Sequence, residues 1–495
     1  MVHLFSRFLA VIAFCATFTT HAAPGDLDTA GFGSGFGKVI TAIGTSTDTA
    51  RAIALQADGK IVVAGTCWNG SNDDFCLARY LASGALDTSF NATGTVITAI
   101  GSSNDTAYAL GLQPDGKLVV AGRCINGGSN ADFCLARYLA SGALDTSFNT
   151  TGKVITGIGF FNDTARALAL QPDGKIVVAG HCTNGSNNDF CLARYLPSGA
   201  LDTSFNTNGK VITAMGTSDD IATALALQPD GKIVTAGYCF NGSSEDFCLA
   251  RYLPSGALDT SFNSTGKVFT AMGFDDDYAT ALALQPDGKI VAAGICGGIF
   301  DNDFCIARYL PSGALDMSFN SIGRAITPIG SSSDYAYALA LQPDGKIVVA
   351  GYCYDGATDF CVARYVASGA LDTNFNGTGK AVTGIGSSTD DAYALALQPD
   401  GKIVVAGECL SGANKVFCLA RYQGGPFDAR NCSMDIDGDN QVLATTDSLI
   451  HARIALGLTG NAVIGGITFA GHATRTTWPA IRDYLVSQCG MSIVP

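Results

Sequence analysis

The segment from Leu55 to Gly65 reads LQADGKIVVAG and decides the fold, because the chain repeats it. Close copies begin at Leu112, Leu170, Leu227, Leu284, Leu341 and Leu397, so that consecutive copies are 56 to 58 residues apart. A period in this range is typical of propellers and solenoids. Most of the 495-residue chain therefore consists of seven copies of one unit.

Each unit carries four strand-like runs. In the first unit these are residues 50–55, 61–64, 75–80 and 96–100, all with a period of two and separated by turn residues. Four antiparallel strands per unit make one propeller blade. We therefore predict an all-β, seven-bladed β-propeller. The Ala-rich first run is expected to be the innermost strand, because small side chains let blades approach one another near the axis.

The ends of the array predict a closed ring. Runs of the VITAI type occur seven times, and the first, at Val39, precedes the first inner strand. The last repeat ends at Tyr422 without such a run. The strand at about residues 39–43 is thus expected to be the outer strand of the seventh blade. The predicted propeller spans residues 24–422.

The repeat resembles the delta-60 repeat of bacterial secreted proteins. The matching stretches are LQPDGKIVVAG, FCLARY and GALDTSF, which recur through the repeat region. The resemblance implies a β-propeller and assigns no activity.

The N-terminus predicts export. Residues 1–22 have the pattern of a signal peptide, with an apolar run from Phe8 to Phe18 and small residues at Thr20 and Ala22. The run is too short for a permanent anchor, and no other stretch is apolar enough to span a membrane. We expect a secreted, periplasmic or cell-surface protein.

Cysteines recur at two positions of each blade. An exported chain favours disulfides, and two thiols without histidine make a poor zinc site. The predicted intra-blade pairs are Cys67–Cys76, Cys124–Cys134, Cys182–Cys191, Cys239–Cys248, Cys296–Cys305, Cys353–Cys361 and Cys409–Cys418. Cys432 and Cys489, which bracket the C-terminal region, form the eighth predicted pair.

The repeats offer little that resembles catalytic machinery. His181 is the only histidine among the blades. The equivalent position in the other six blades holds residues that share no chemistry, which predicts a variable exposed position. Arginines such as Arg79 and aspartates such as Asp87 recur in every blade, so we expect ion pairs; a ring of identical ligand sites is the alternative. Arg51 and Arg166 are the nearest approach to an unsymmetrical site in the channel, and they do not make a reaction.

The C-terminal region predicts a calcium site. After a linker at residues 423–431, a small helical module is expected at 432–495. Its start resembles a dockerin-type, EF-hand-like loop, which implies Ca²⁺ ligands at Asp435, Asp437, Asp439, Gln441 and Asp447. The loop carries one residue more than that pattern, and a second loop is not found. A plain Asp-rich turn is the alternative.

These observations predict a secreted, non-catalytic binding or structural protein. The net charge of −14 disfavours nucleic acid. The propeller is expected to be monomeric and to present a rigid platform to a carbohydrate, an extracellular protein or a surface polymer. Variable loops between the paired cysteines, which include Trp68, Phe240 and Tyr354, could carry specificity or reflect drift. The alternative function is a polysaccharide lyase or glycosidase on a propeller scaffold.

Overall fold

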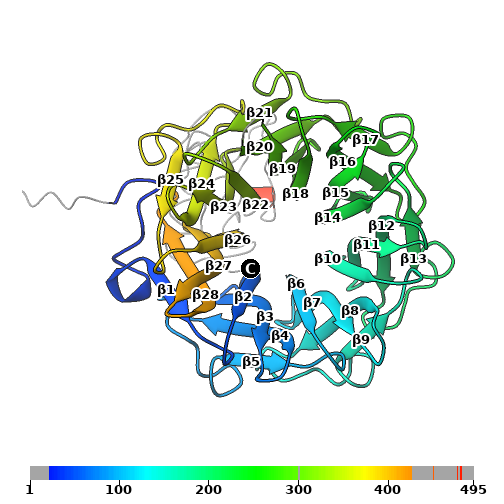
Figure 1. Ribbon diagram of the computed structural model, residues 1–495, viewed down its shortest axis with the longest axis horizontal. Helices are drawn as coiled ribbons and strands as arrows, with labels where there is room; N and C mark the ends of the chain where they lie inside the picture. Colours follow the sequence, from blue (N-terminus) through cyan, green and yellow to red (C-terminus); the bar gives the residue numbers. More distant parts are fainter. Residues whose placement is uncertain (1–21, 299–300, 426–449, 451–476, 478–479, 482–495) are drawn as a thin grey trace, which may run out of the picture.

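The computed structural model describes residues 22–298, 301–425, 450, 477 and 480–481. Almost all of the predicted signal peptide and C-terminal module, including the five expected calcium ligands and the Cys432–Cys489 pair, lies outside these residues. No helix in the described part of the chain is long and apolar enough to cross a membrane. The described residues form a ring of seven four-stranded antiparallel sheets (Figure 1). The predicted seven-bladed propeller is confirmed.

The first blade shows the arrangement that all blades share. Its strands, from the axis outward, are β2 (Asp48–Leu55), β3 (Ile61–Trp68), β4 (Asp73–Tyr80) and β5 (Thr95–Thr98). The remaining blades are β6 (Asp105–Leu112), β7 (Leu118–Ile125), β8 (Ala131–Tyr138) and β9 (Lys153–Thr156); β10 (Asp163–Leu170), β11 (Ile176–Thr183), β12 (Asn188–Tyr195) and β13 (Lys210–Thr213); β14 (Asp220–Leu227), β15 (Ile233–Phe240), β16 (Glu245–Tyr252) and β17 (Lys267–Thr270); β18 (Asp277–Leu284), β19 (Ile290–Gly297), β20 (Asn302–Tyr309) and β21 (Arg324–Thr327); β22 (Asp334–Leu341), β23 (Ile347–Tyr354), β24 (Thr358–Tyr365) and β25 (Lys380–Thr383); and β26 (Asp390–Leu397), β27 (Ile403–Ser411) and β28 (Asn414–Tyr422) with β1 (Lys38–Thr41).

The inner strands begin two residues earlier than the alternation predicted. Asp48, the first residue of β2, is fully buried, and its carboxylate accepts hydrogen bonds from the backbone N–H groups of Ile43 and Gly44. This aspartate recurs at the start of every inner strand. It satisfies the donors of the preceding loop, so each inner strand starts at a fixed point.

The hydrophobic core lies between adjacent blades. Val62 and Ala64 of the first blade pack in one cluster with Leu118 and Val120 of the second, and equivalent clusters join the other neighbours. Because each blade covers the face of the next, the ring must close to bury the last face.

The N-terminal strand closes the ring. β1 pairs with β28 in the seventh blade, with Val39 opposite Leu419. A preceding short 3₁₀ turn, η1 (Gly33–Gly35), lies beside Phe32, which is buried against the same blade. Asp28 supplies the carboxylate that pairs with Arg421, 2.7 Å from its Nη2. The seventh blade is thus assembled from both ends of the repeat region.

The recurring arginines form the predicted ion pairs. Arg79 Nε lies 2.8 Å from Asp87 Oδ2, and its guanidinium stacks on the ring of Phe90. A second nitrogen donates to the carbonyl of Ala140 in the next blade at 2.6 Å. The same set occurs in the other blades, so these arginines join strands to loops and blades to blades.

The seven predicted intra-blade disulfides are confirmed. In each, one cysteine lies near the end of the second strand and its partner lies in the third, with Cα atoms 5.7 to 5.9 Å apart. The cysteines are buried, which fits a structural role rather than a redox role.

Candidate functional site

Every inner strand contains a β-bulge at its fourth residue. In the first blade Ala50 pairs with Gly65 and Ala52 with Ala64, which leaves Arg51 without a partner in the ladder. The unpaired residues in the seven blades are Arg51, Tyr108, Arg166, Thr223, Thr280, Tyr337 and Tyr393. A bulge re-aims the extra side chain. Here the bulges direct seven side chains toward the axis of the ring.

The final glycine of the LQPDGKIVVAG motif makes this bulge possible. A Cβ atom at Gly65 would lie 1.9 Å from the carbonyl oxygen of Thr49, and the equivalent glycines are equally crowded. A side chain cannot fit at this point without displacing the inner strand. The repeated motif therefore encodes the geometry of the channel wall as well as the turn.

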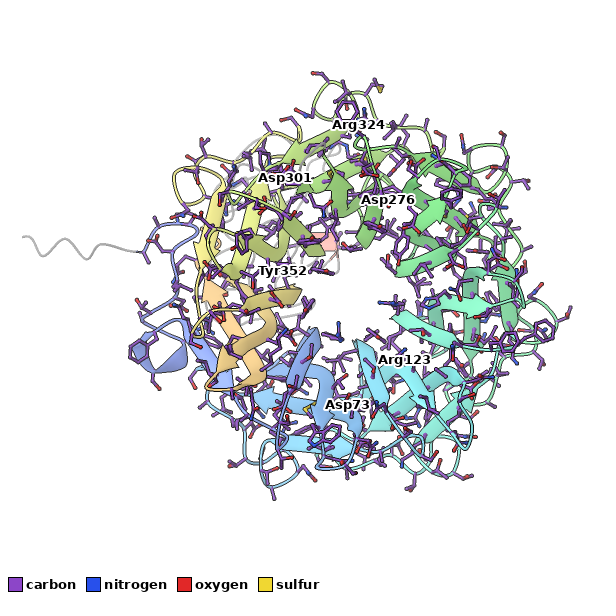
Figure 2. The ribbon with its side chains drawn as sticks, viewed as in Figure 1. Asp73, Arg123, Asp276, Asp301, Arg324 and Tyr352 are labelled. Atoms are coloured by element: carbon purple, nitrogen blue, oxygen red, sulfur yellow. A yellow bond between two sulfur atoms is a disulfide. The ribbon has the colours of Figure 1, made fainter. Side chains whose placement is uncertain are left out.

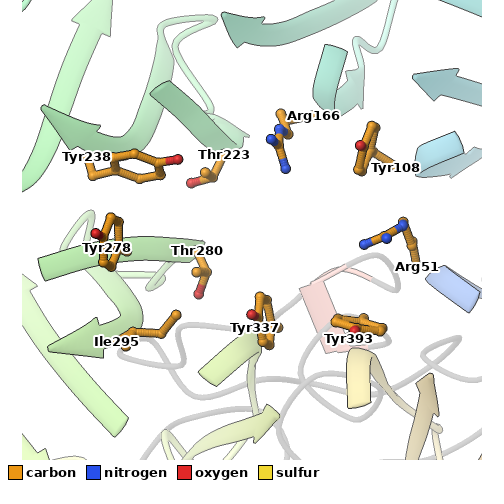
Figure 3. Close-up of a pocket in the computed structure, with 10 residues that line it drawn as sticks. All are labelled: Arg51, Tyr108, Arg166, Thr223, Tyr238, Tyr278, Thr280, Ile295, Tyr337 and Tyr393. Atoms are coloured by element: carbon orange, nitrogen blue, oxygen red, sulfur yellow. The ribbon is translucent and has the colours of Figure 1, made fainter. Parts of the chain in front are cut away.

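The seven bulge residues, with three others, surround a cavity of about 270 Å³ at the channel mouth (Figure 3). The additional residues are Tyr238, Tyr278 and Ile295. The wall therefore consists largely of tyrosine, threonine and arginine. Such a wall can stack against a ring and form several hydrogen bonds.

Two arginines stand on one side of this cavity. Figure 3 shows Tyr108 between Arg51 and Arg166, and the guanidinium carbons lie 5.2 and 4.9 Å from the centre of its ring. Arg51 also lies 5.2 Å from the ring centre of Tyr393. Within the described residues, neither arginine forms an ion pair or a hydrogen bond, and the Nε atom of each is buried. Their donors are therefore free for an anion.

The position that holds His181 also faces the mouth, so the predicted exposure is wrong, although the position varies between blades as predicted. The position pairs across the sheet with the second residue of the inner strand; His181, for example, lies opposite Thr164. Only Arg123 is exposed among the seven occupants of this position, which are Thr66, Arg123, His181, Tyr238, Ile295, Tyr352 and Glu408. Burial, with the charges of Arg166 and Arg123, lowers the pKa of His181 to about 3. The imidazole is neutral at physiological pH and is a weak base.

The seventh blade places charged groups beside the cavity. Asp391 and Glu408 face each other across β26 and β27, and both are buried. The Lys415 ammonium contacts Glu408 and lies 3.5 Å from Asp391 Oδ2. Thr49 of the first blade donates to Glu408 at 2.5 Å, and the hydroxyl of Tyr393 lies 3.5 Å from the same carboxylate. Sequence reasoning missed this cluster, although the signal was present. No other blade has this combination of Asp, Glu and Lys at the positions of Asp391, Glu408 and Lys415.

Tyrosines line the remaining wall. Tyr337 stacks on Tyr352 with ring centres 5.6 Å apart, and it meets Tyr393 edge-on at 5.2 Å. Burial, together with neighbouring tyrosines and the carboxylate of Asp391, raises the pKa of Tyr352 far above its ordinary value, and burial with the seventh-blade carboxylates raises that of Tyr393 as well. Both phenols stay protonated and can act as hydrogen-bond donors. No cluster of three or more metal-ligating side chains occurs within the described residues.

A family model described as a domain of unknown function forming a β-propeller (DUF5122) matches the chain once in each blade. The matched residues are 56–90, 113–148, 171–205, 228–262, 285–319, 342–375 and 398–423. No curated protein matches the chain. The delta-60 resemblance and the calcium loop stay predictions.

Several solved structures show a general likeness. One is an ulvan lyase of polysaccharide lyase family PL25, with a TM-score of 0.45 and 10% identity, covering 77% of this chain and 96% of that one. A catalytically inactive virginiamycin B lyase from Staphylococcus aureus has a TM-score of 0.45 and 11% identity, covering 77% and 98%. The polysaccharide lyase Uly1 has a TM-score of 0.44 and 14% identity, covering 78% and 91%.

Proposed function

We propose that this protein is an exported binding protein that holds an acidic sugar residue at the mouth of its central channel. The observation that carries the proposal is the pair of guanidinium groups on the cavity wall, Arg51 and Arg166, which contact tyrosine rings but form no ion pair or hydrogen bond within the described residues. The chain has a net charge of −14, and its repeated structural arginines are neutralised by aspartates. Two half-buried arginines without a carboxylate are suited to binding an anion from solution.

The rest of the wall supports a sugar as the ligand. Tyr337 and Tyr393 line the cavity with aromatic rings, and the hydroxyl oxygens of Thr223 and Thr280 can accept hydrogen bonds. The cavity of about 270 Å³ is smaller than the usual range for drug-sized ligands. It is the right scale for one or two sugar units. Disulfides in every blade support an oxidising, extracellular location, where such ligands occur.

Binding is favoured over catalysis by the state of the titratable groups. With its pKa near 3, His181 is a poor proton acceptor. The Glu408 carboxylate already accepts from Thr49 and contacts Lys415, so its oxygens are occupied.

A polysaccharide-active enzyme is the second candidate, and one observation favours it. Glycoside hydrolysis uses two carboxyl groups flanking the scissile bond, and only the seventh blade brings two carboxylates, Asp391 and Glu408, together beside the cavity. Tyr393, which lines the cavity, links this pair to Arg51. Release of reducing ends from an acidic polysaccharide would support this function.

We also propose that the C-terminal region binds Ca²⁺ through Asp435, Asp437, Asp439, Gln441 and Asp447 in a small helical module. The support is the alternation of carboxylates in the sequence.

Titration calorimetry with oligouronides and matched neutral oligosaccharides tests the binding function. We expect binding of the acidic ligand only, weakened by added salt. Arg51→Gln and Arg166→Gln should each lower the affinity by about 10- to 100-fold, the range for a lost charged hydrogen bond. Arg324→Gln removes the same charge at the outer rim (Figure 2) and should have no effect. Equal affinity for neutral and acidic ligands, or indifference to both channel variants, would refute the proposal.

A further inference from the structure

The loop before the third inner strand carries two exposed aromatic side chains. Phe160 is 76% exposed and Phe161 is 52% exposed. The equivalent pairs are small and polar in five blades: Thr45–Ser46, Ser102–Ser103, Thr217–Ser218, Ser331–Ser332 and Ser387–Ser388. The fifth blade has Phe274 followed by Asp275. Large exposed apolar side chains that replace polar ones at a fixed position of a repeat indicate a binding role.

This loop is held in place at both ends. The Phe160 N–H donates to the Thr183 carbonyl at 2.9 Å, and the Asn162 side chain accepts from the N–H of Ala131 in the preceding blade at 2.9 Å. The Phe160 ring lies over Gly185, where even a Cβ atom would be within 3.8 Å of it. The two rings are therefore displayed from a fixed backbone, which limits the entropy cost of using them to bind.

The loop leads directly into the cavity wall. β10 begins at Asp163, and its bulge residue Arg166 lines the cavity. The two phenylalanines thus lie five and six residues before an arginine of the cavity wall, on the loop that enters the same strand.

We infer that Phe160 and Phe161 form a second subsite, which stacks the next units of the acidic oligosaccharide whose terminal residue is held by Arg51 and Arg166. This inference rests on the proposed function. It adds that the ligand is a chain of sugars bound at its end, rather than a free acidic sugar.

The surroundings favour a sugar chain over a protein partner at this position. Two rings among serine, threonine and asparagine residues can stack on the apolar faces of sugars. They do not form the continuous apolar patch that lies at the centre of a stable protein interface.

Charge directs the chain toward the third blade rather than the fifth. Phe274 is 87% exposed, but Asp275 and Asp276 follow it and would repel an acidic polymer. The strand that follows the third-blade loop carries Arg166, and the preceding blade carries the exposed Arg123, which Figure 2 labels; the charges of both act on His181 of the third blade. Phe274 therefore serves as a matched control: the same residue type at the same repeat position, in surroundings of opposite charge.

The experiment compares a monouronide with a tetrauronide by calorimetry, using the full chain. Wild-type protein should bind the tetramer about tenfold more tightly, as expected for one stacking contact. The double substitution Phe160→Ser with Phe161→Ser, which copies the other blades, should abolish this gain and leave monouronide binding unchanged. Phe274→Ser should change neither affinity.

The outcomes separate the two proposals. If wild-type protein binds both ligands equally, or if the double variant keeps its preference for the tetramer, the second subsite is wrong and the proposed function stands. If wild-type protein binds neither ligand, both are wrong. Circular dichroism and melting temperature of the variants exclude misfolding as the cause, since both side chains are exposed.

Discussion

The interface between the seventh blade and the first differs from the other six interfaces in both charge and covalent continuity. Six interfaces join consecutive segments of the chain, whereas the seventh joins segments from its two ends. The same repeat positions hold different residues at the two kinds of interface. The comparison shows which interactions hold together blades that are consecutive in the chain, and which hold the last blade to the first.

At each of the six interfaces, two aspartates stand near a basic side chain. At the interface of the second and third blades these are Asp132, Asp163 and Lys210, whose ammonium donates to the carbonyl of Gly157. Burial raises the pKa of Asp132, and the charge of Lys210 opposes that shift. The basic residues are Lys153, Lys210, Lys267, Arg324, Lys380 and Lys38, and each donates to a carbonyl of the neighbouring blade.

The closing interface has lost both the second aspartate and the basic residue. Val416 stands where the other blades have an aspartate, and Thr95 stands where they have lysine or arginine. The two replacements occur together, which indicates that the basic residue serves to offset the buried carboxylates. At the closing interface Thr49 of the first blade instead donates a hydrogen bond to Glu408 of the seventh.

The largest effect is expected from removing the closing strand. Deletion of residues 22–41 exposes the edge of β28 and removes Phe32 from a core cluster that also contains Leu419. The melting temperature should fall by about 10 °C or more, because the loss exceeds several kcal/mol. Deletion of residues 426–495 is the matched control and should leave propeller melting nearly unchanged. Equal shifts for the two truncations would contradict the role of the N-terminal strand.

A moderate effect is expected from making the closing interface resemble the others. Val416 is 3% exposed, so Val416→Asp buries a carboxylate without a basic neighbour and should cost about 2 kcal/mol or more. Adding Thr95→Lys should recover a substantial part of that loss. Chemical denaturation of the two single variants and the double variant gives the coupling free energy. A coupling near zero would show that the joint replacement has no energetic basis.

The smallest effect concerns pH at the six interfaces. Burial, followed by the charges of Asp301 and Asp334, raises the pKa of Asp303 to about 6, and burial chiefly raises that of Asp105 to about 6. Such groups bind protons more tightly when folded, so their contribution is complete below the unfolded pKa near 4 and is lost as pH rises through 6. We therefore expect a higher melting temperature at pH 5 than at pH 8.

The variant Asp303→Asn sharpens this test. It should stabilise the protein at pH 8 by about 1 kcal/mol at most and flatten the pH profile between 5 and 8. Below pH 4 stability should instead fall as the pH falls. The hydrogen bond from Ser89, with the Arg79 ion pair, holds the pKa of Asp87 near 2, so protonation of that aspartate destabilises the fold. A melting temperature that rises steadily from pH 5 to pH 8 would contradict the expectation.

Much of the fold could be predicted because the repeat reports the same structure seven times. The four strands per blade, the inner position of the Ala-rich strand and the seven disulfides follow from period-two alternation and from cysteine spacing. The seventh copy of the Asp-and-Phe pair was missed, although Asp28 and Phe32 follow the GALDTSF pattern at the other end of the chain.

The site was harder to predict because of the bulges. An extra residue at Arg51 shifts the alternation, so counting by twos along the inner strand misplaces the faces on either side of it. The His181 position was predicted to be exposed on another ground, because the equivalent positions hold residues that share no chemistry. The Asp391, Glu408 and Lys415 cluster was missed for a different reason: its members lie on three strands of the seventh blade and come together only when those strands pair.

The bulge also bears on how such a protein can change over evolutionary time. A residue that forms no ladder hydrogen bonds is released from the demands of strand pairing, so arginine, tyrosine and threonine are interchangeable there at little cost to the sheet. Seven such positions surround one opening, and each can vary independently of the others. The residues that line the cavity can therefore change in many combinations while the propeller backbone stays the same. New ligand preferences could therefore arise by single substitutions, with no intermediate that fails to fold.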